Sequence, residues 1–319
     1  MSIPMQRLPE QQPSVWQPAS VKEAIQLQKQ WGDAAVVVAG GTWLRTRWEN
    51  GVSAVPRHLI SLGRIPALKS LSMDERRVVL NDGERELMGP LYIRYGPLLS
   101  LSAVMTSELT REHAPLLIQA CAEVAAPSIR NMATIGGNVM TCTGDLIPAL
   151  LVLDAQVVLS DGGQERKLPL QAWLAATADP SEIMTGILLP LQATTGESKS
   201  CQFYLKAGRR EAFTPSVVTV AGELTFQPDG TIASAKLAAG GGTAIPARLT
   251  QAEALLTGQP LSKALLKKLH SAAYEQCAAV PDDYAGIAYR KTTAANLIVS
   301  ECYKAWRASK GGGADASES

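Results

Sequence analysis

The sequence lacks the clustered ligands from which most protein metal sites are made. Its cysteines are scattered, odd in number and never arranged as a CxxC pair: Cys121, Cys142, Cys201, Cys277 and Cys302. The three histidines also lie far apart in the chain. This pattern argues against a disulfide framework, a zinc site and a four-cysteine iron–sulfur cluster. We therefore expect no metal site built from this chain alone.

Charge excess and long apolar runs are also missing. The net charge is +1 and no basic stripe stands out, which argues against nucleic acid as a partner. The most apolar stretch, "LIPALLVLDAQVVL", is interrupted by Asp154 and Gln156, and no run reaches the roughly 18 apolar residues of a membrane span. The first residues contain no apolar segment of the signal-peptide type. We expect a cytoplasmic protein with no membrane insertion.

The composition that is present suits a globular protein of more than one domain. Hydrophobic residues make up 46% and charged residues 18% of the 319 residues. Near the start, Ser20 and Glu23 have the spacing of a capping box, and Gly32 follows as a stop signal, which predicts a short amphipathic helix. A strand over residues 34–38, a helix "PLLIQACAEVAA" that ends before Pro127, and a helix over residues 147–153 are also expected.

The order of these segments predicts an α+β fold. Short strands and helices alternate up to about Pro190, which indicates more than one small sheet. After a polar, linker-like stretch, strands separated by Pro-Asp-Gly and Gly-Gly-Gly turns are followed by helices. A C-terminal sheet of three or four strands with helices on one face fits this pattern. The tail "KGGGADASES" is too polar to pack and is expected to be disordered.

Two segments share one pattern, in which an apolar strand runs into Gly-Gly, a polar residue and further apolar residues. We call residues 37–44 the first glycine turn and residues 134–138 the second. Glycines leave no Cβ between chain and ligand, and successive free N–H groups form an anion-binding concavity. Two such concavities facing each other would suit a diphosphate, with Thr42, Thr134 and Asn138 as further donors. The alternative for each is an ordinary tight turn.

Two charged residues can be explained without a ligand. Asp145 follows the second glycine turn and could accept a hydrogen bond from a ligand, or could cap the helix expected from Ile147. Lys206, taken by itself, reads as a solvated lysine on a strand. The chain shows no paired carboxylates and no Ser–His–Asp constellation, so we expect no catalytic acid, base or nucleophile in it.

The strings "VAGGTWL", "PSIRNMATIGGN" and "GDLIPALLVLDA" resemble the flavoprotein (medium) subunit of the xanthine dehydrogenase / carbon monoxide dehydrogenase family of molybdenum hydroxylases. The likeness extends to "QPASVKEAIQLQ", "EIMTGILLPL" and "FYLKAGRREAFTPSVVTVAGEL", and covers residues 14–307 approximately. The resemblance implies a p-cresol-methylhydroxylase-type FAD-binding domain of two α+β subdomains over residues 14–192. A CO dehydrogenase flavoprotein C-terminal-like domain over residues 200–307 follows it. An N-terminal arm (1–13) and a disordered tail (308–319) complete the expected organisation.

The resemblance also implies a set of FAD-binding residues. The first glycine turn and the second would wrap the diphosphate and ribityl chain, Asp145 would bind polar groups of the flavin, and three further residues would line the cofactor. The full set is Val37, Val38, Ala39, Gly40, Gly41, Thr42, Trp43, Leu44, Val124, Thr134, Ile135, Gly136, Gly137, Asn138, Asp145, Met184 and Lys206. A cation at Lys206 would favour an anionic reduced flavin. A valine at Gly136 or Gly137 is expected to expel FAD while the fold survives.

Two sequence details depart from many relatives. Trp43 stands where a small or acidic residue is usual, and it could stack near the cofactor or fill a gap. The loop between Asn138 and Asp145 is about two residues shorter and lacks a proline, so Asp145 must still reach the ring across it. No residue for covalent flavin attachment is evident, although Cys142 lies in this loop. We expect non-covalent FAD.

The function that the resemblance implies is electron transfer inside a complex. A large subunit would carry the molybdenum cofactor, a small subunit would carry [2Fe–2S] clusters, and FAD on this chain would pass electrons to NAD or another acceptor. The substrate would then be chosen by another chain. Two alternatives stay open: a stand-alone flavin oxidoreductase of the same fold, and a flavin-free scaffold subunit.

Overall fold

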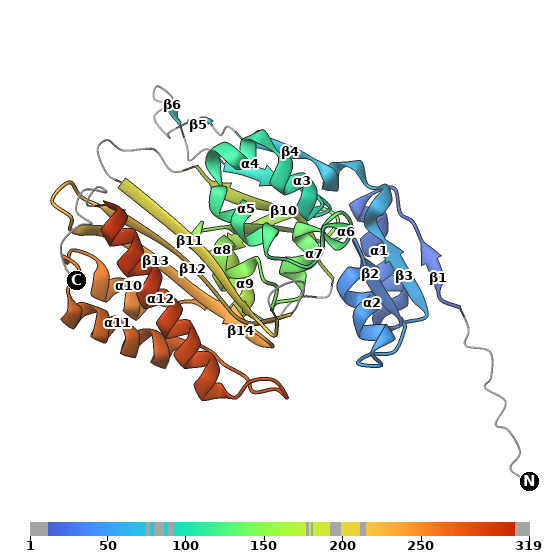
Figure 1. Cartoon of the computed structure of the whole chain (residues 1–319). Helices are drawn as coiled ribbons and strands as arrows, with labels where there is room; N and C mark the ends of the chain where they lie inside the picture. Colours follow the sequence, from blue (N-terminus) through green and yellow to red (C-terminus); the bar gives the residue numbers. More distant parts are fainter. Residues whose placement is uncertain are drawn as a thin grey trace, which may run out of the picture.

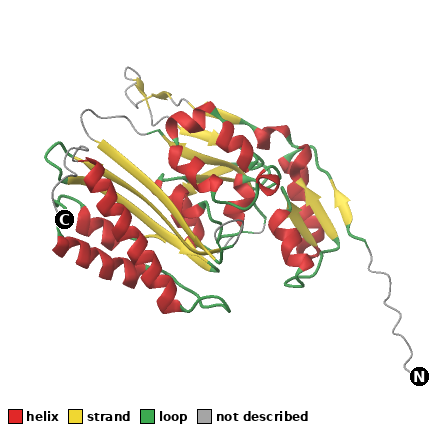
Figure 2. Cartoon of the chain, viewed as in Figure 1, coloured by secondary structure: helices red, strands yellow, loops and turns green. Residues whose placement is uncertain are grey.

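The computed structural model describes residues 12–74, 77–79, 86–88, 92–176, 179, 181–191, 199–210 and 215–309. The chain forms a mixed α/β structure in which an N-terminal part with two main sheets packs against a C-terminal sheet with its own helices (Figure 1). Strands and helices alternate along the N-terminal part of the chain, and Figure 2 shows that in the C-terminal part they form separate layers. The predicted α+β class is confirmed.

The first sheet is parallel, with the strand order β1 (Ser14–Trp16), β3 (His58–Ser61) and β2 (Ala35–Val38). Helix α1 (Val21–Trp31) covers it and begins at Ser20, whose hydroxyl accepts a hydrogen bond from the Glu23 N–H, while the Glu23 carboxylate accepts one from the Ala19 N–H. The Ser20 half of the capping box is confirmed, whereas the Glu23 carboxylate binds the N–H of Ala19, one residue before the N-cap. Helix α2 (Thr42–Glu49) and the 3₁₀ turns Gly32–Ala34, Leu62–Arg64 and Pro66–Lys69 complete this unit.

The second sheet is antiparallel, in the order β4 (Leu71–Asp74), β7 (Tyr92–Tyr95), β10 (Ile183–Pro190), β8 (Gln156–Ser160) and β9 (Glu165–Pro169). A separate small hairpin pairs β5 (Arg77–Val79) with β6 (Glu86–Met88), and residues 80–85 between them lie outside the described part. The helices of this part are α3 (Leu101–Thr106), α4 (Glu108–His113), α5 (Pro115–Ala122), α6 (Pro127–Arg130), α7 (Ile135–Met140), α8 (Ile147–Val152) and α9 (Leu170–Ala175).

Helix α8 lies at the centre of the molecule. All its residues are buried, and its sequence, "IPALLV", is apolar on every side, as expected of a helix with no solvent-facing stripe. Pro148 occupies the first turn, where its missing N–H costs no helical hydrogen bond. The core around α8 includes Tyr204, Ala221 and Ala238 of the C-terminal sheet, so one continuous apolar core joins both parts of the chain.

The C-terminal part is an antiparallel sheet with helices on its outer face. The strand order is β11 (Lys199–Gly208), β12 (Ser216–Phe226), β13 (Ile232–Gly241) and β14 (Ala244–Arg248). Helices α10 (Thr250–Leu256), α11 (Lys263–Gln276) and α12 (Ile287–Ser309) cover one face, and α8 packs toward the other (Figure 1). The predicted arrangement is confirmed. The expected tail, however, starts too early, because α12 still includes Ala308 and Ser309; residues 310–319 lie outside the described part.

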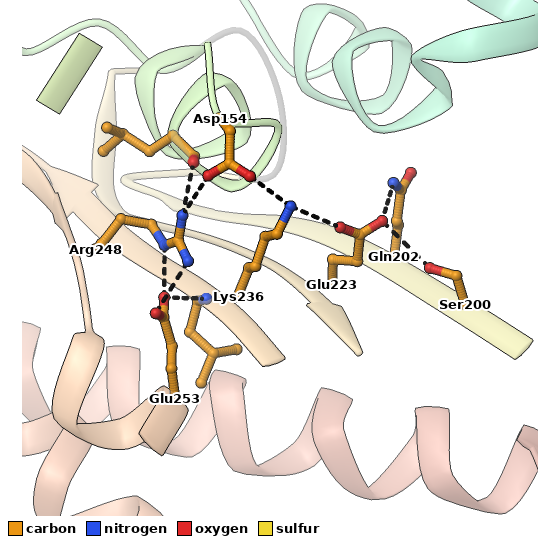
Figure 3. Close-up of polar contacts among 9 residues, drawn as sticks. Asp154, Ser200, Gln202, Glu223, Lys236, Arg248 and Glu253 are labelled. Carbon is orange, nitrogen blue, oxygen red and sulfur yellow. Dashed lines mark hydrogen bonds and ion pairs between the residues drawn. The ribbon is translucent and has the colours of Figure 1, made fainter. Parts of the chain in front are cut away.

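A polar network joins the end of α8 to the C-terminal sheet (Figure 3). Asp154, which follows α8 with a φ of 52°, accepts hydrogen bonds from Lys236 on β13 and from Arg248 on β14. Arg248 also donates to Glu253 on α10 through two nitrogens, at 2.5 and 2.9 Å. Burial by itself would lower the pKa of Arg248, but the bonds to Glu253 and the charge of Asp154 raise it above its usual value. Arg248 therefore remains a cation bound to both acids.

In the part of the chain that the structure describes, no helix combines the length and the apolar character needed to cross a bilayer.

The network gives a stability prediction. Glu253→Ala removes a carboxylate that also accepts the Leu237 N–H, and it leaves Arg248 partly unpaired in a largely buried position. We expect a loss of about 3 kcal/mol in the free energy of unfolding, measured by urea denaturation. The control is Glu49→Ala, which breaks the exposed Arg45–Glu49 pair and should change stability by less than about 0.5 kcal/mol. Equal effects from the two changes would contradict this account.

Candidate cofactor site at the two glycine turns

The first glycine turn presents an open helix N-terminus. Strand β2 ends at Val38, Gly41 adopts a left-handed conformation with φ 70° at the N-cap, and α2 begins at Thr42. No described side chain caps this helix. Among the described residues, the N–H groups of residues 41–44 have no acceptor, whereas Arg45 N–H bonds to the Gly41 carbonyl. Free N–H groups and the positive end of the helix dipole together favour an anion at this position.

The two glycine turns lie against each other. A Cβ atom built on Gly40 would overlap the carbonyl oxygen of Met132, and one built on Gly137 would lie 4.0 Å from the Cβ of Ala39. Gly40 therefore permits a backbone approach that no other residue would allow. The prediction that residues 37–44 and 134–138 meet in space is confirmed.

The second glycine turn differs from its predicted form. Residues 133–135 do not form a strand that enters a Gly-Gly turn, because Thr134 is the N-cap of α7 and Ile135 is its first residue. Its N–H groups are already bonded: Ile135 donates to Leu99 O, Gly136 to Pro97 O, Gly137 to Thr134 Oγ1 and Asn138 to Thr134 O. The expectation of a second anion-binding concavity with free N–H groups is wrong. Thr134, Ile135 and Gly136 are buried in the fold, and only Gly137 and Asn138 are partly exposed.

Asn138 anchors the loop that carries Asp145. Its Oδ1 accepts the Leu146 N–H at 3.1 Å, and its carbonyl accepts the Thr141 hydroxyl at 2.7 Å. Gly144 packs so closely on Asn138 that a Cβ would overlap the side-chain oxygen. The short loop is therefore closed back onto α7, and Asp145 is directed toward the C-terminal sheet.

Asp145 connects the N-terminal part to two strands of the C-terminal sheet. Its Oδ2 lies 2.8 Å from Lys206 Nζ on β11, and its Oδ1 accepts the Ser216 hydroxyl of β12 at 2.6 Å. Its carbonyl accepts the Tyr204 hydroxyl at 2.8 Å. Burial first, and then the charge of Asp145, raise the pKa of Tyr204 well above its usual value, so this phenol stays protonated as a donor. The helix-cap alternative is wrong, since α8 has Leu146 as its N-cap and no side-chain cap.

Lys206 is buried, not solvated: only 5% of its side chain is exposed. Its ammonium also donates to the Glu123 carbonyl at 2.8 Å, in the turn that ends α5. Arg130 donates to the carbonyls of the same turn, at Ala122, Val124 and Ala125. Two cations thus hold this helix C-terminus, where partial negative charge accumulates. Asp145 and Lys206 are thus bonded to each other, and Lys206 also reaches the turn that contains Val124.

The other predicted residues occupy different surroundings. Met184 on β10 is 4% exposed and packs in the main core. Trp43 is 46% exposed, with the guanidinium of Arg47 lying 4.7 Å from its ring centroid, so it does not fill a gap. Sequence reasoning missed Tyr204 and Ser216. Tyr204 could have been found, because it shares a strand face with Lys206 two residues later, but nothing local marks Ser216.

Proteins that bind a phosphate-bearing cofactor share three features with this site. These are a helix N-terminus open to an anion, close backbone packing around that N-terminus, and a nearby cluster of polar groups. Residues 9–83 and 88–192 match the family described as the FAD binding domain in molybdopterin dehydrogenase. Residues 203–305 match the CO dehydrogenase flavoprotein C-terminal domain. The chain belongs to the family of FAD-binding medium subunits of molybdenum hydroxylases, and it is an oxidoreductase subunit whose cofactor is FAD.

Individual relatives are similar to this chain over most of its length. The nicotinate dehydrogenase FAD-subunit of Eubacterium barkeri is 26% identical over 282 residues, 83% of this chain and 87% of that protein. The xanthine dehydrogenase FAD-binding subunit of Escherichia coli O157:H7 is 23% identical over 230 residues, 70% and 72% of the two chains. A chain of the carbon monoxide dehydrogenase structure from Hydrogenophaga pseudoflava has the same fold, with a TM-score of 0.80 and 23% identity over 94% of this chain and 99% of that one.

The two glycines of α7 should respond differently to substitution. A Cβ on Gly136 would lie 2.8 Å from the Cα and carbonyl oxygen of Pro97, whereas one on Gly137 would be close only to the Thr134 side chain. Gly136→Ala should therefore lower the free energy of unfolding by about 1–3 kcal/mol without any cofactor present, and Gly137→Ala by less. Thermal unfolding of the two apoproteins measures this, and a more stable Gly136→Ala than Gly137→Ala would contradict it. The expectation that a valine at Gly136 leaves the fold intact is wrong, because its side chain would overlap Pro97.

Proposed function

We propose that this chain is the electron-transfer subunit of a molybdenum hydroxylase complex. In this proposal it associates with a large subunit that carries the molybdenum cofactor and a small subunit that carries [2Fe–2S] clusters. Electrons from the clusters pass through FAD to NAD or another acceptor. The names of the relatives support this role, because they are FAD subunits of nicotinate and xanthine dehydrogenases and a medium chain of carbon monoxide dehydrogenase.

One observation favours a relay over a stand-alone enzyme. The titratable side chains that the structure brings to the candidate site are Asp145, Lys206 and Tyr204, and each is bonded to another member of the cluster. None of them is placed as a free acid or base in the described part of the chain. A flavin exchanges one or two electrons by itself, while the protein provides position and electrostatics. A subunit that only transfers electrons needs no more than this.

The first glycine turn supports the proposed position of the diphosphate. Its N–H groups at residues 41–44 are the donors without a described acceptor, whereas those of the second glycine turn are used internally. We therefore assign the diphosphate to Val37–Leu44, and Thr134–Asn138 to a wall that shapes the site through packing. Val124, Asp145, Met184 and Lys206 complete the proposed lining around non-covalent FAD. We propose residues 14–192 and 200–307 as the two domains, with the second extended to Ser309 by the end of α12.

The composition of the native complex tests the proposal. The chain, purified from its host with an affinity tag, should bring along one larger and one smaller protein, with FAD, molybdenum and iron in the complex. Substrate oxidation by the chain alone, with its flavin but without molybdenum or iron, would favour the stand-alone enzyme. A colourless chain in an active complex would favour the scaffold.

A charge placed at the first glycine turn tests the diphosphate position. Thr42→Asp puts a carboxylate in the first turn of α2, where it interacts favourably with the helix dipole but repels a bound phosphate. The apoprotein should gain about 0.3–1 kcal/mol in stability, while the Kd for FAD should rise by roughly tenfold or more. Thermal unfolding and flavin fluorescence quenching measure the two effects.

Two variants control for this change. Thr46→Asp places the same charge one turn further along α2, at an exposed position, and should affect FAD much less. Thr42→Asn keeps the size without the charge and should retain FAD. Unchanged FAD affinity in Thr42→Asp would remove the first glycine turn as the diphosphate site.

A further inference from the structure

Ser216 reaches the candidate site through an irregularity in the C-terminal sheet. On β11 and β12, Lys206 pairs with Thr219 and Ala207 with Val218, but Gly208 pairs with Ser216, so Val217 is an extra residue on β12. With regular alternation from Thr219, the side chain of Ser216 would point to the opposite face from that of Lys206. A bulge of this kind redirects a side chain. It brings the Ser216 hydroxyl to the same carboxylate that Lys206 binds.

The bulge is fixed from the other side by a buried cation. Arg290 on α12 is 2% exposed and donates from Nη1 to the Val217 carbonyl at 2.6 Å. The Ser216 carbonyl accepts the Gly242 N–H at 3.1 Å, so the two peptide groups that follow the Ser216 side chain are both held. Ser216 itself is 7% exposed. Its hydroxyl is therefore a rigidly placed donor, not a surface group that happens to be close.

The two Asp145 oxygens have divided roles. Oδ1 receives the Ser216 hydroxyl and Oδ2 faces Lys206. We propose that Ser216 is a positioning residue of the flavin site, which holds the Asp145 carboxylate so that Lys206 meets the cofactor as half of a neutral pair and not as a free cation. This inference rests on the proposed function, because it requires the flavin to lie beside Asp145 and Lys206.

A redox consequence follows from the charge balance. An uncompensated ammonium stabilises the reduced, anionic flavin more than the oxidised one and so raises the reduction potential. Removing the Ser216 hydroxyl frees Oδ1, loosens the carboxylate and leaves the Lys206 charge less compensated. The ratio of the FAD dissociation constants for the oxidised and the reduced cofactor should rise by about tenfold in Ser216→Ala. For a two-electron couple this corresponds to about 30 mV.

The test is a double-mutant cycle on the FAD-loaded protein, with the flavin potential measured by reductive titration against a redox dye. Ser216→Ala should raise the potential, Asp145→Asn should raise it further, and Lys206→Met should lower it. In the Lys206→Met background, Ser216→Ala should have no effect on the potential, because it acts only through that cation. An unchanged potential in Ser216→Ala, or an equal shift with and without Lys206, would overturn the proposal.

Matched variants separate positioning from a general structural role. Ser216→Thr keeps the hydroxyl, and Ser216→Val has nearly the volume of that threonine with a methyl in place of the hydroxyl. Of these two variants only the valine should shift the potential, so the comparison holds even if the alanine variant folds poorly. Ser200→Ala removes a hydroxyl that donates to another carboxylate, Glu223, near the far end of the same strand pair, and should leave the potential unchanged. If none of the Ser216, Asp145 and Lys206 variants changes the potential, the proposed flavin site is wrong. If the Asp145 and Lys206 variants change the potential and the Ser216 variants do not, the site stands and only the role of Ser216 is wrong.

Discussion

The ion pair between Asp145 and Lys206 is the constraint on which the arrangement of the candidate site depends. Only 16% of the aspartate side chain and 5% of the lysine side chain are exposed, so neither charge is well hydrated. A buried charge of this kind is tolerated only when it is paired and its remaining hydrogen-bonding groups are satisfied. Breaking such a pair from one side costs about 3–5 kcal/mol. The loop before α8, strand β11 and the end of α5 must therefore close around the pair together.

Closure of the site and docking of the C-terminal sheet are thus one event. Asp145 belongs to the N-terminal part, whereas Lys206, Tyr204 and Ser216 belong to the C-terminal sheet, so neither part could form the cluster alone.

The ion pair with Asp145 also changes the electrostatic role expected of Lys206. A free ammonium would act on a flavin as a full positive charge, whereas a lysine that shares its charge with Asp145 acts mainly as a dipole.

The sequence predicted best those features that depend on neighbouring residues. The N-cap at Ser20, the stop at Gly32 and the apolar helix α8 are encoded within a few residues, and each was found where expected. Residues 134–138 were misassigned because threonine and isoleucine favour strands, whereas the Thr134 hydroxyl caps a helix. Which N–H groups stay free there depends on Pro97 and Leu99, about forty residues earlier. The partners of Asp145 likewise come from strands sixty to seventy residues later.

The two acids that flank α8 show how the same residue type serves two purposes. Asp145 precedes the helix and contacts β11 and β12, while Asp154 follows it and contacts β13 and β14. An acid after a helix opposes the dipole, and Lys236 and Arg248 both compensate Asp154, with Arg248 also donating to the Leu151 carbonyl. Asp154 is 46% exposed, so salt screens its ion pairs, whereas the Asp145 pair is shielded. Solvent and salt therefore weaken the effect of Asp154 on its neighbours. Asp145 acts on Lys206 with little screening, because both side chains are largely buried.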